Sequence, residues 1–108
     1  MLAVSRFRYD DNEVDLPQRE LGACLALLQS FPGCVSGSVG RALDDPALWL
    51  LATSWRNVGA YRRAMSSYEV KADFMQVLGR AIDEPSAFEV LAGDGMTEAN
   101  EAKPRGAG

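Results

Sequence analysis

Histidine is absent from the 108 residues of this chain. Its absence excludes Ser-His and Cys-His nucleophilic dyads, the commonest general base, and most zinc and non-haem iron sites. Cysteine is scarce: Cys24 and Cys34 are the only two, and without C-x-x-C spacing we expect small buried hydrophobes rather than a redox or metal motif. Any chemistry must rely on Tyr, Arg, Asp, Glu, Ser or the substrate, so we expect no metal ion and no cofactor.

Positive charge is also in short supply. The 11 Lys and Arg residues are outnumbered by 15 Asp and Glu, which gives a net charge of −4 and a pI of about 4.7. Nucleic-acid binding needs clustered cations, and Arg62-Arg63 is a short pair that we interpret as a solvated helix face, so no nucleic-acid partner is expected. No apolar run is long enough to span a bilayer, and no secretory signal pattern opens the chain. We therefore expect a cytoplasmic protein without a membrane partner.

Apolar residues make up 47% of the chain, enough for the core of one small domain, which we place at residues 1–92. Alternation of apolar residues predicts strands, and helical spacing predicts helices. The expected elements are a strand over 2–9, a helix capped at Asp15 and ended by Pro32-Gly33, strands over 34–43 and 47–55, a helix capped at Asn57, a helix with a Ser66/Glu69 capping box, and a strand over 86–92. Residues 93–108 are small and charged, which predicts a disordered tail.

This order predicts an α+β fold of the ferredoxin-like kind, β-α-β-β-α-α-β, with an antiparallel sheet and helices on one face. Residues 48–52, LWLLA, are apolar on both faces of their strand, whereas the helices can cover only one. We therefore expect a homodimer formed through the sheet faces. Gly37 and Gly40, inside the strand over 34–43, indicate a bulge, a close approach of another group or a twisted edge strand.

The segment LWLLATSWRNVGAYRRAM, residues 48–65, changes from strand to helix at Asn57, a favourable helix N-cap. Trp55 ends the strand and Tyr61 lies one turn into the helix. We expect the two rings to meet at the mouth of the cavity between sheet and helix. A Trp and a Tyr in this position suit either a ligand site or core packing.

The segments AVSRFRY, LLQSFPGCVSGSVG, DDPALWLLATSW, AYRRAMSS and FEVLA together resemble the antibiotic biosynthesis monooxygenase superfamily of dimeric α+β barrels. The resemblance covers residues 2–92. Its members include cofactor-free oxygenases that convert anthrone-type polyketides into quinones, haem-degrading monooxygenases, quinol monooxygenases and many proteins of unknown role.

The haem-degrading branch carries an Asn, a Trp and an iron-ligating His at positions that correspond here to Ser5, Ala64 and Phe74. All three residues differ. A phenyl ring cannot coordinate iron, and the chain has no histidine to replace it. The resemblance therefore does not extend to haem degradation.

The cofactor-free branch uses a Trp and a Tyr in the strand-to-helix segment, which Trp55 and Tyr61 match in type and spacing. The resemblance implies that these two residues hold a flat aromatic substrate and stabilise its anion, with Arg6, or alternatively Arg56, supplying positive charge. The apolar wall of the substrate site is expected to comprise Trp49, Met65, Tyr68, Phe74 and Phe88.

The sequence thus predicts a small cofactor-independent monooxygenase for an aromatic polyketide, anthrone or quinol-type substrate. The alternative is a non-catalytic dimeric module that binds a small hydrophobic ligand or a protein partner. Other reactions of dimeric α+β barrels, such as isomerisation of lactones, also stay open, because a fold does not fix a function.

Overall fold

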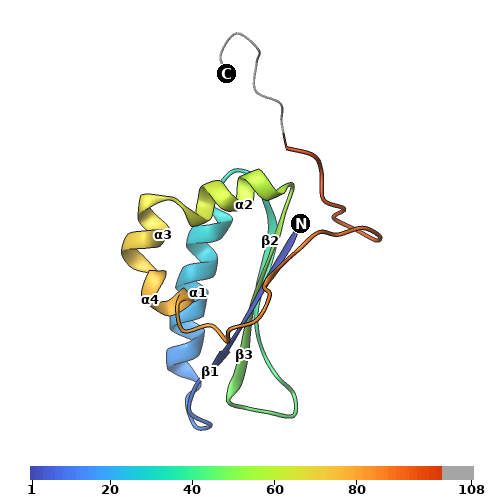
Figure 1. The fold of residues 1–108 in the computed structure, drawn as a ribbon. Coiled ribbons are helices and arrows are strands. Elements are labelled where there is room, and N and C mark those ends of the chain that lie inside the picture. Colours follow the sequence, from blue (N-terminus) through green and yellow to red (C-terminus); the bar gives the residue numbers. More distant parts are fainter. Residues whose placement is uncertain (101–108) are drawn as a thin grey trace.

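The computed structural model describes residues 1–100 and forms one sheet with helices packed against one face (Figure 1). The elements in chain order are β1 (Leu2–Arg8), α1 (Asp15–Gln29), β2 (Cys34–Arg41), β3 (Leu48–Trp55), α2 (Val58–Met65), α3 (Tyr68–Asp73), α4 (Met75–Leu78) and β4 (Ala87–Phe88). The strand order is β2-β3-β1-β4, and every pair is antiparallel. This arrangement confirms the predicted α+β, ferredoxin-like fold.

Strand alternation decides which side chains face the helices. In β3 the buried residues Trp49, Leu51, Thr53 and Trp55 alternate with the half-buried residues Leu48, Leu50, Ala52 and Ser54. The register of β1 against β3 pairs Ala3 with Thr53 and Ser5 with Leu51 on the inner face. The outer face carries the alternate residues and has no helix over it (Figure 1).

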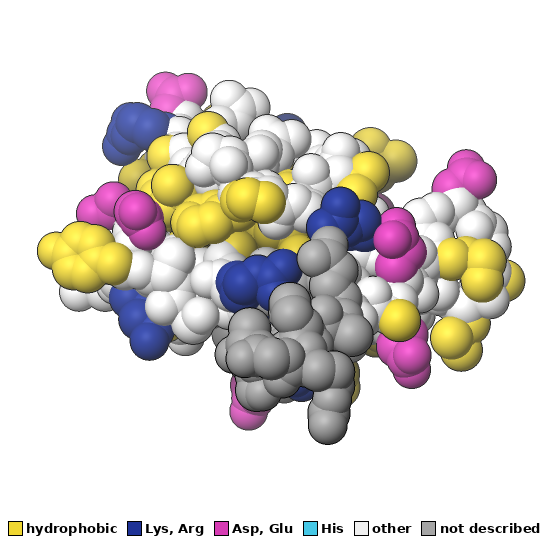
Figure 2. Space-filling view, turned by 90° about the horizontal axis from the view of Figure 1, so that it is seen from above, with side chains coloured by type: hydrophobic (Ala, Val, Ile, Leu, Met, Phe, Trp, Pro, Cys, Tyr) yellow, Lys and Arg dark blue, Asp and Glu magenta, His cyan; other side chains and the backbone are white. Residues whose placement is uncertain are grey.

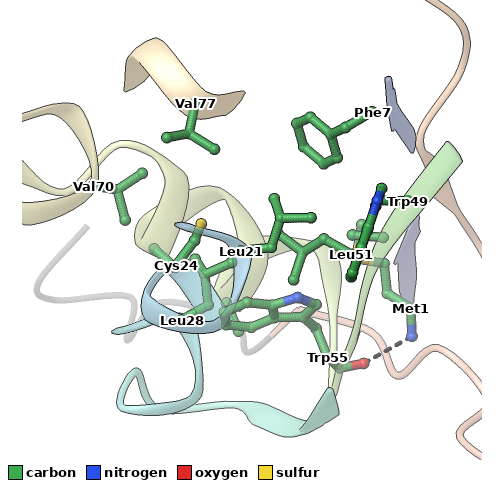
Figure 3. Close-up of a cluster of buried hydrophobic side chains, with 13 residues drawn as sticks. Met1, Phe7, Leu21, Cys24, Leu28, Trp49, Leu51, Trp55, Val70 and Val77 are labelled. Atoms are coloured by element: carbon green, nitrogen blue, oxygen red, sulfur yellow. Dashed lines mark hydrogen bonds between the residues drawn. The ribbon is translucent and has the colours of Figure 1, made fainter. Parts of the chain in front are cut away.

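The hydrophobic core lies between the inner face and the helices. Trp49 and Trp55, near the two ends of β3, both belong to this cluster, and Leu51 lies between them along the strand (Figure 3). The backbone of Trp55 is joined to Met1 by two hydrogen bonds of 2.7 Å, which fix the end of β3 beside the start of β1. Within residues 1–100, no helix has the length and apolar character to cross a membrane.

Two predicted helix caps are displaced by one residue. The N–H of Gln18 donates to the carbonyl of Val14, so α1 begins at Asp15 and the carboxylate of Asp15 lies in the first turn instead of capping it. Ser66 still donates its N–H to Arg62 and ends α2, while the hydroxyl of Ser67 accepts the N–H of Val70. Only the Asn57 cap is found where the sequence predicts it.

The last predicted helix and the last predicted strand are both shorter than expected. The helix is divided at Phe74, whose φ of −127° and ψ of 2° leave the helical region. The strand expected over 86–92 pairs only at Ala87 and Phe88, because the N–H of Val90 donates to the side chain of Thr97 and the N–H of Thr97 to the carbonyl of Val90. These bonds close a loop that turns the chain away from β1.

The segment after this loop follows the strand-to-helix junction. The N–H of Glu98 donates to the carbonyl of Arg56 at 2.9 Å, and the side chain of Asn100 accepts the N–H of Gly59 at 2.8 Å. Residues 93–100, predicted to begin a disordered tail, thus have defined hydrogen bonds. The remainder of that predicted tail, 101–108, lies outside the described residues.

Gly37 and Gly40 lie inside β2, where the sequence indicates a bulge, a close approach of another group or a twisted edge strand. The register of β2 against β3 shifts between Cys34 and Ser36, before either glycine, so the irregularity is not at Gly37 or Gly40. At Gly37 a Cβ atom would overlap the end of the Leu25 side chain, so the missing side chain leaves the space that Leu25 of α1 occupies against β2.

Candidate functional site

The Asn57 cap brings Trp55 and Tyr61 together at the start of α2. The side-chain oxygen of Asn57 accepts the N–H of Ala60 at 2.8 Å, which satisfies one of the free donors of the first turn. The two rings meet edge to face, with 5.8 Å between their centroids and 67° between their planes. The contact predicted from the sequence is therefore present.

Trp55 itself is turned into the core. It is 1% exposed, and its indole N–H donates to the hydroxyl of Thr53 at 2.8 Å. Because that donor is already bonded within the protein, Trp55 supports Tyr61 from behind and does not present its N–H to a ligand.

Tyr61 lies between two spaces. The inner cavity, between the sheet and the helices, has a volume of about 20 Å³. Its wall consists of the apolar residues Ala3, Leu28, Leu51, Met65 and Leu78 and the hydroxyl-bearing residues Ser5, Thr53 and Tyr61. The interior of the protein is thus nearly filled, with room for one small molecule.

The edge pocket, on the other side of Tyr61, has a volume of about 210 Å³. Its wall consists of Met1, Val58, Tyr61, Arg62, Ala87, Phe88 and Glu89, from the start of β1, from α2 and from the region of β4. Tyr61 is the one side chain that lines both the edge pocket and the inner cavity. The view onto the α2 end of the molecule shows Lys and Arg side chains beside a band of hydrophobic side chains (Figure 2).

The hydroxyl of Tyr61 has no hydrogen-bond partner within residues 1–100. Burial raises the pKa of this phenol above its ordinary value, so it keeps its proton at neutral pH. Tyr61 therefore provides a hydrogen-bond donor to whatever occupies the pocket, and it is poorly suited to act as a base.

Arg6 does not belong to this site. It follows Ser5 on β1, so it points to the outer face of the sheet, where its guanidinium forms two hydrogen bonds with Glu84 at 2.5 and 2.6 Å. This contact holds the pKa of the Glu84 carboxyl below its usual value. Arg62, which the sequence suggested only as a solvated residue, lines the edge pocket with Tyr61, and so does the carboxylate-bearing residue Glu89.

Comparison with known proteins was made by sequence and by structure. The family model of the antibiotic biosynthesis monooxygenases matches residues 3–74, two thirds of the chain. The chain belongs to the antibiotic biosynthesis monooxygenase family. No curated protein matches the sequence.

Solved structures share the fold of this monooxygenase-family chain at low sequence identity. A variant of SnoaB, a cofactor-independent oxygenase from Streptomyces nogalater, is 18% identical with a TM-score of 0.67, covering 85% of this chain and 96% of that one. Rv0793 from Mycobacterium tuberculosis is 20% identical with a TM-score of 0.61, covering 94% and 97%. A conserved protein from Methanosarcina mazei is 16% identical with a TM-score of 0.63, covering 80% and 84%.

The other residues expected in the site of this family member fall into two groups. Met65 lines the inner cavity and Phe88 the edge pocket, so both lie beside Tyr61. Tyr68 is 82% exposed, Phe74 packs against the core between α3 and α4, and Trp49 is buried at the far end of β3. None of these three lines either space.

The positions that differ from the haem-degrading branch of the family are also separated. Ser5 lines the inner cavity, Ala64 is fully buried in α2, and Phe74 lies at the bend between α3 and α4. In the part of the chain that the structure describes, no group of three His, Cys, Asp or Glu side chains is placed to hold a metal ion.

Sequence reasoning missed Thr53, Ser5, Val58 and Met1. Alternation along the two central strands places Ser5 and Thr53 on the same face as Trp55, and that signal was sufficient to find them. The roles of Met1 and Val58 depend on how α2 packs across the start of β1, which no local pattern encodes.

Proposed function

We propose that this protein is a cofactor-independent monooxygenase that binds a small phenol or quinol in the edge pocket. The observation that carries the proposal is the Tyr61 hydroxyl, a half-buried donor without an internal partner within residues 1–100, in a pocket whose other polar side chains are Arg62 and Glu89. Few placed polar groups in an otherwise apolar pocket are typical of sites for aromatic ligands.

The size of the edge pocket favours a substrate of one or two rings. Its volume is about 210 Å³, below the roughly 300–1,000 Å³ common for drug-sized ligands. A quinol or a naphthol therefore suits the pocket better than the tricyclic anthrones that the family resemblance also suggested.

The reaction needs only the ring and molecular oxygen. A phenolate passes an electron to dioxygen, and the resulting pair combines at a hydrogen-bearing ring carbon ortho or para to the phenolate oxygen, C2 in 1,4-dihydroxynaphthalene, to give a peroxide. In the keto form that carbon keeps one hydrogen, so loss of water from the protonated peroxide leaves a new carbonyl. One oxygen atom enters the product and the other leaves as water, and the substrate loses two hydrogens in total, one from the ring carbon and one from its hydroxyl group.

Tyr61 and Arg62 would lower the energy of the anion. The Tyr61 hydroxyl donates a hydrogen bond to the phenolate oxygen, and Arg62 favours the charged over the neutral phenol. The raised pKa of Tyr61 keeps this donor protonated while the substrate ionises.

The test is oxygen uptake with 1,4-dihydroxynaphthalene, measured against the same solution without protein. We expect one hydroxynaphthoquinone for each dioxygen consumed, with one ¹⁸O atom in the product when ¹⁸O₂ is supplied. Formation of unlabelled naphthoquinone and hydrogen peroxide at the protein-free rate would reject the activity.

A second function is favoured by the filled interior. The inner cavity is small and the Trp55 N–H is already bonded, features that suit a non-catalytic module which binds a small hydrophobic ligand. Saturable binding of the naphthol, followed by tryptophan fluorescence, without oxygen consumption would identify this alternative.

The proposal includes a homodimer formed through the outer face of the sheet. Leu2 and its β4 partner Phe88 are exposed on this face, which also carries Val4 of β1 and Leu50 of β3. Burying such a surface favours association. We expect a dimer in sedimentation velocity and a monomer after Leu50→Glu, with Leu43→Glu in the exposed β2–β3 loop as the control. A wild-type monomer at micromolar concentration would reject the dimer.

The proposal also places the protein in the cytoplasm. Cys24 and Cys34 are both free thiols, which suits a reducing compartment.

A further inference from the structure

The inner cavity behind Tyr61 has the size of a single small molecule. Its volume of about 20 Å³ exceeds the roughly 10–15 Å³ that one water-sized sphere needs, and it is far too small for an aromatic ring. The cavity and the edge pocket share the Tyr61 side chain as a wall, so an occupant of the cavity and a ring bound in the pocket would contact the same side chain.

Most of the cavity wall is hydrocarbon or thioether. Ala3, Leu28, Leu51, Met65 and Leu78 contribute no polar side-chain atoms. A water molecule needs two to four hydrogen-bond partners to be stable in the interior, whereas an apolar molecule loses little on leaving water. Thr53, one of the three hydroxyl residues of the wall, already uses its oxygen to accept the indole N–H of Trp55.

We propose that the inner cavity is a binding site for molecular oxygen. The inference rests on the proposed oxygenase function, which supplies the aromatic co-substrate in the edge pocket. Dioxygen is apolar, fits a space of this size, and would be held against the Tyr61 side chain, which the bound ring also contacts.

Hydroxyl groups in the cavity wall could also stabilise the negative charge that oxygen acquires as it gains electrons. Because the oxygen of Thr53 accepts a hydrogen bond from Trp55, the hydroxyl hydrogen of Thr53 is left to donate. Ser5 carries a second hydroxyl group of the wall, whereas the proton of the Tyr61 hydroxyl is directed to the phenolate in the edge pocket. Donors fixed in place around a developing negative charge stabilise it without reorganisation.

The direct test is NMR of the methyl-labelled protein under oxygen pressure. Dissolved oxygen is paramagnetic, so methyl protons near a site that it occupies relax faster. We expect a severalfold larger enhancement at the methyl groups of Leu51 and Met65 than at those of Leu21 and Val70, which are equally or more deeply buried but do not line the cavity. Equal enhancement at both sets would overturn the proposal, and so would a long-lived water molecule with cross-peaks to the Leu51 methyl groups.

A matched pair of variants separates the two spaces. Ala3 and Ala87 are partners across β1 and β4, but Ala3 lines the inner cavity and Ala87 the edge pocket. We expect Ala3→Val to abolish the enhancement at Leu51 and to raise the KM for oxygen severalfold, with unchanged affinity for the naphthol. Ala87→Val should weaken naphthol binding and leave the enhancement in place.

The outcomes distinguish this inference from the proposed function. Oxygen in the cavity without any turnover would support the site and reject the oxygenase activity. Turnover without enhancement at Leu51 and Met65 would support the activity and overturn the oxygen site. If Ala3→Val fails to fold, the wild-type spectrum alone decides.

Discussion

Trp55 and Trp49 stand on the same face of β3, at its two ends, and differ in their hydrogen bonds. The indole N–H of Trp55 donates to Thr53, whereas that of Trp49 has no partner within residues 1–100 although the residue is 3% exposed. Each indole meets a tyrosine edge to face: Tyr61 at one end, and Tyr9 at 6.4 Å at the other. The two ends differ further in whether the tyrosine hydroxyl has a hydrogen-bond partner.

The tyrosine at the Trp49 end is fully engaged by its neighbours. The hydroxyl of Tyr9 donates to Glu20 at 2.9 Å, Glu20 also accepts a hydrogen bond from Arg80 at 2.7 Å, and the Arg80 guanidinium lies 5.9 Å from the Tyr9 ring centre. Tyr61 has no such partner. We call the end where the tyrosine hydroxyl is bonded within the protein the closed end, and the end where the phenol is available to a ligand the open end.

The largest effect should come from removing that phenol. Tyr61→Phe should lower kcat/KM for the naphthol by about 10²–10³-fold, the usual loss for one oxyanion donor. Tyr9→Phe, at the closed end, should leave the rate unchanged, and so should Tyr68→Phe because that side chain is in solvent. Steady-state oxygen uptake measures all three variants. A Tyr61→Phe enzyme as active as the wild type would reject the role of the Tyr61 hydroxyl as a donor to the substrate.

The two tryptophans should differ next, in stability. Trp55→Phe deletes a buried hydrogen bond and leaves the Thr53 hydroxyl without its donor, whereas Trp49→Phe deletes a donor that has no partner. We expect Trp55→Phe to be the more destabilising by about 1–3 kcal/mol in urea unfolding. Equal losses would indicate that both indoles stabilise the fold by volume alone.

Features set by local chain geometry could be predicted from the sequence, whereas features set by long-range contacts could not. Alternation and helical spacing predicted the topology, and Asn57 with its flanking aromatics predicted the ring contact, because these are local consequences of chain geometry. Arg6 was assigned to the site although alternation with Ser5 already placed it on the opposite face. The exchange of Arg6 for Arg62 follows from how α2 lies beside β4, a long-range contact that no local pattern carries.

The closed end should have a pH signature that the open end lacks. Burial, followed by the hydrogen bond to Glu20, raises the pKa of Tyr9 to about 12. The native state therefore keeps this proton above pH 10, where the unfolded chain releases it. The contribution of the protonated Tyr9 to the free energy of unfolding is complete below pH 10 and is lost as the pH rises to about 12. The difference in unfolding free energy between wild type and Tyr9→Phe should shrink across this range in urea titrations. A constant difference would show that the phenol is not held protonated by its neighbours.

The smallest effect distinguishes the two arginines. Arg62 lines the edge pocket and contributes charge to it, not apolar surface. Arg62→Gln should therefore raise the KM for the naphthol severalfold, because the attraction for its anion is lost, with little change in kcat. The effect should be larger at low ionic strength, because an exposed charge is screened by salt. Arg6→Gln breaks the contact with Glu84 on the outer face and should change neither constant. A reversed result would mean that the substrate binds on the outer face of the sheet, where a second subunit and not Tyr61 would complete the site.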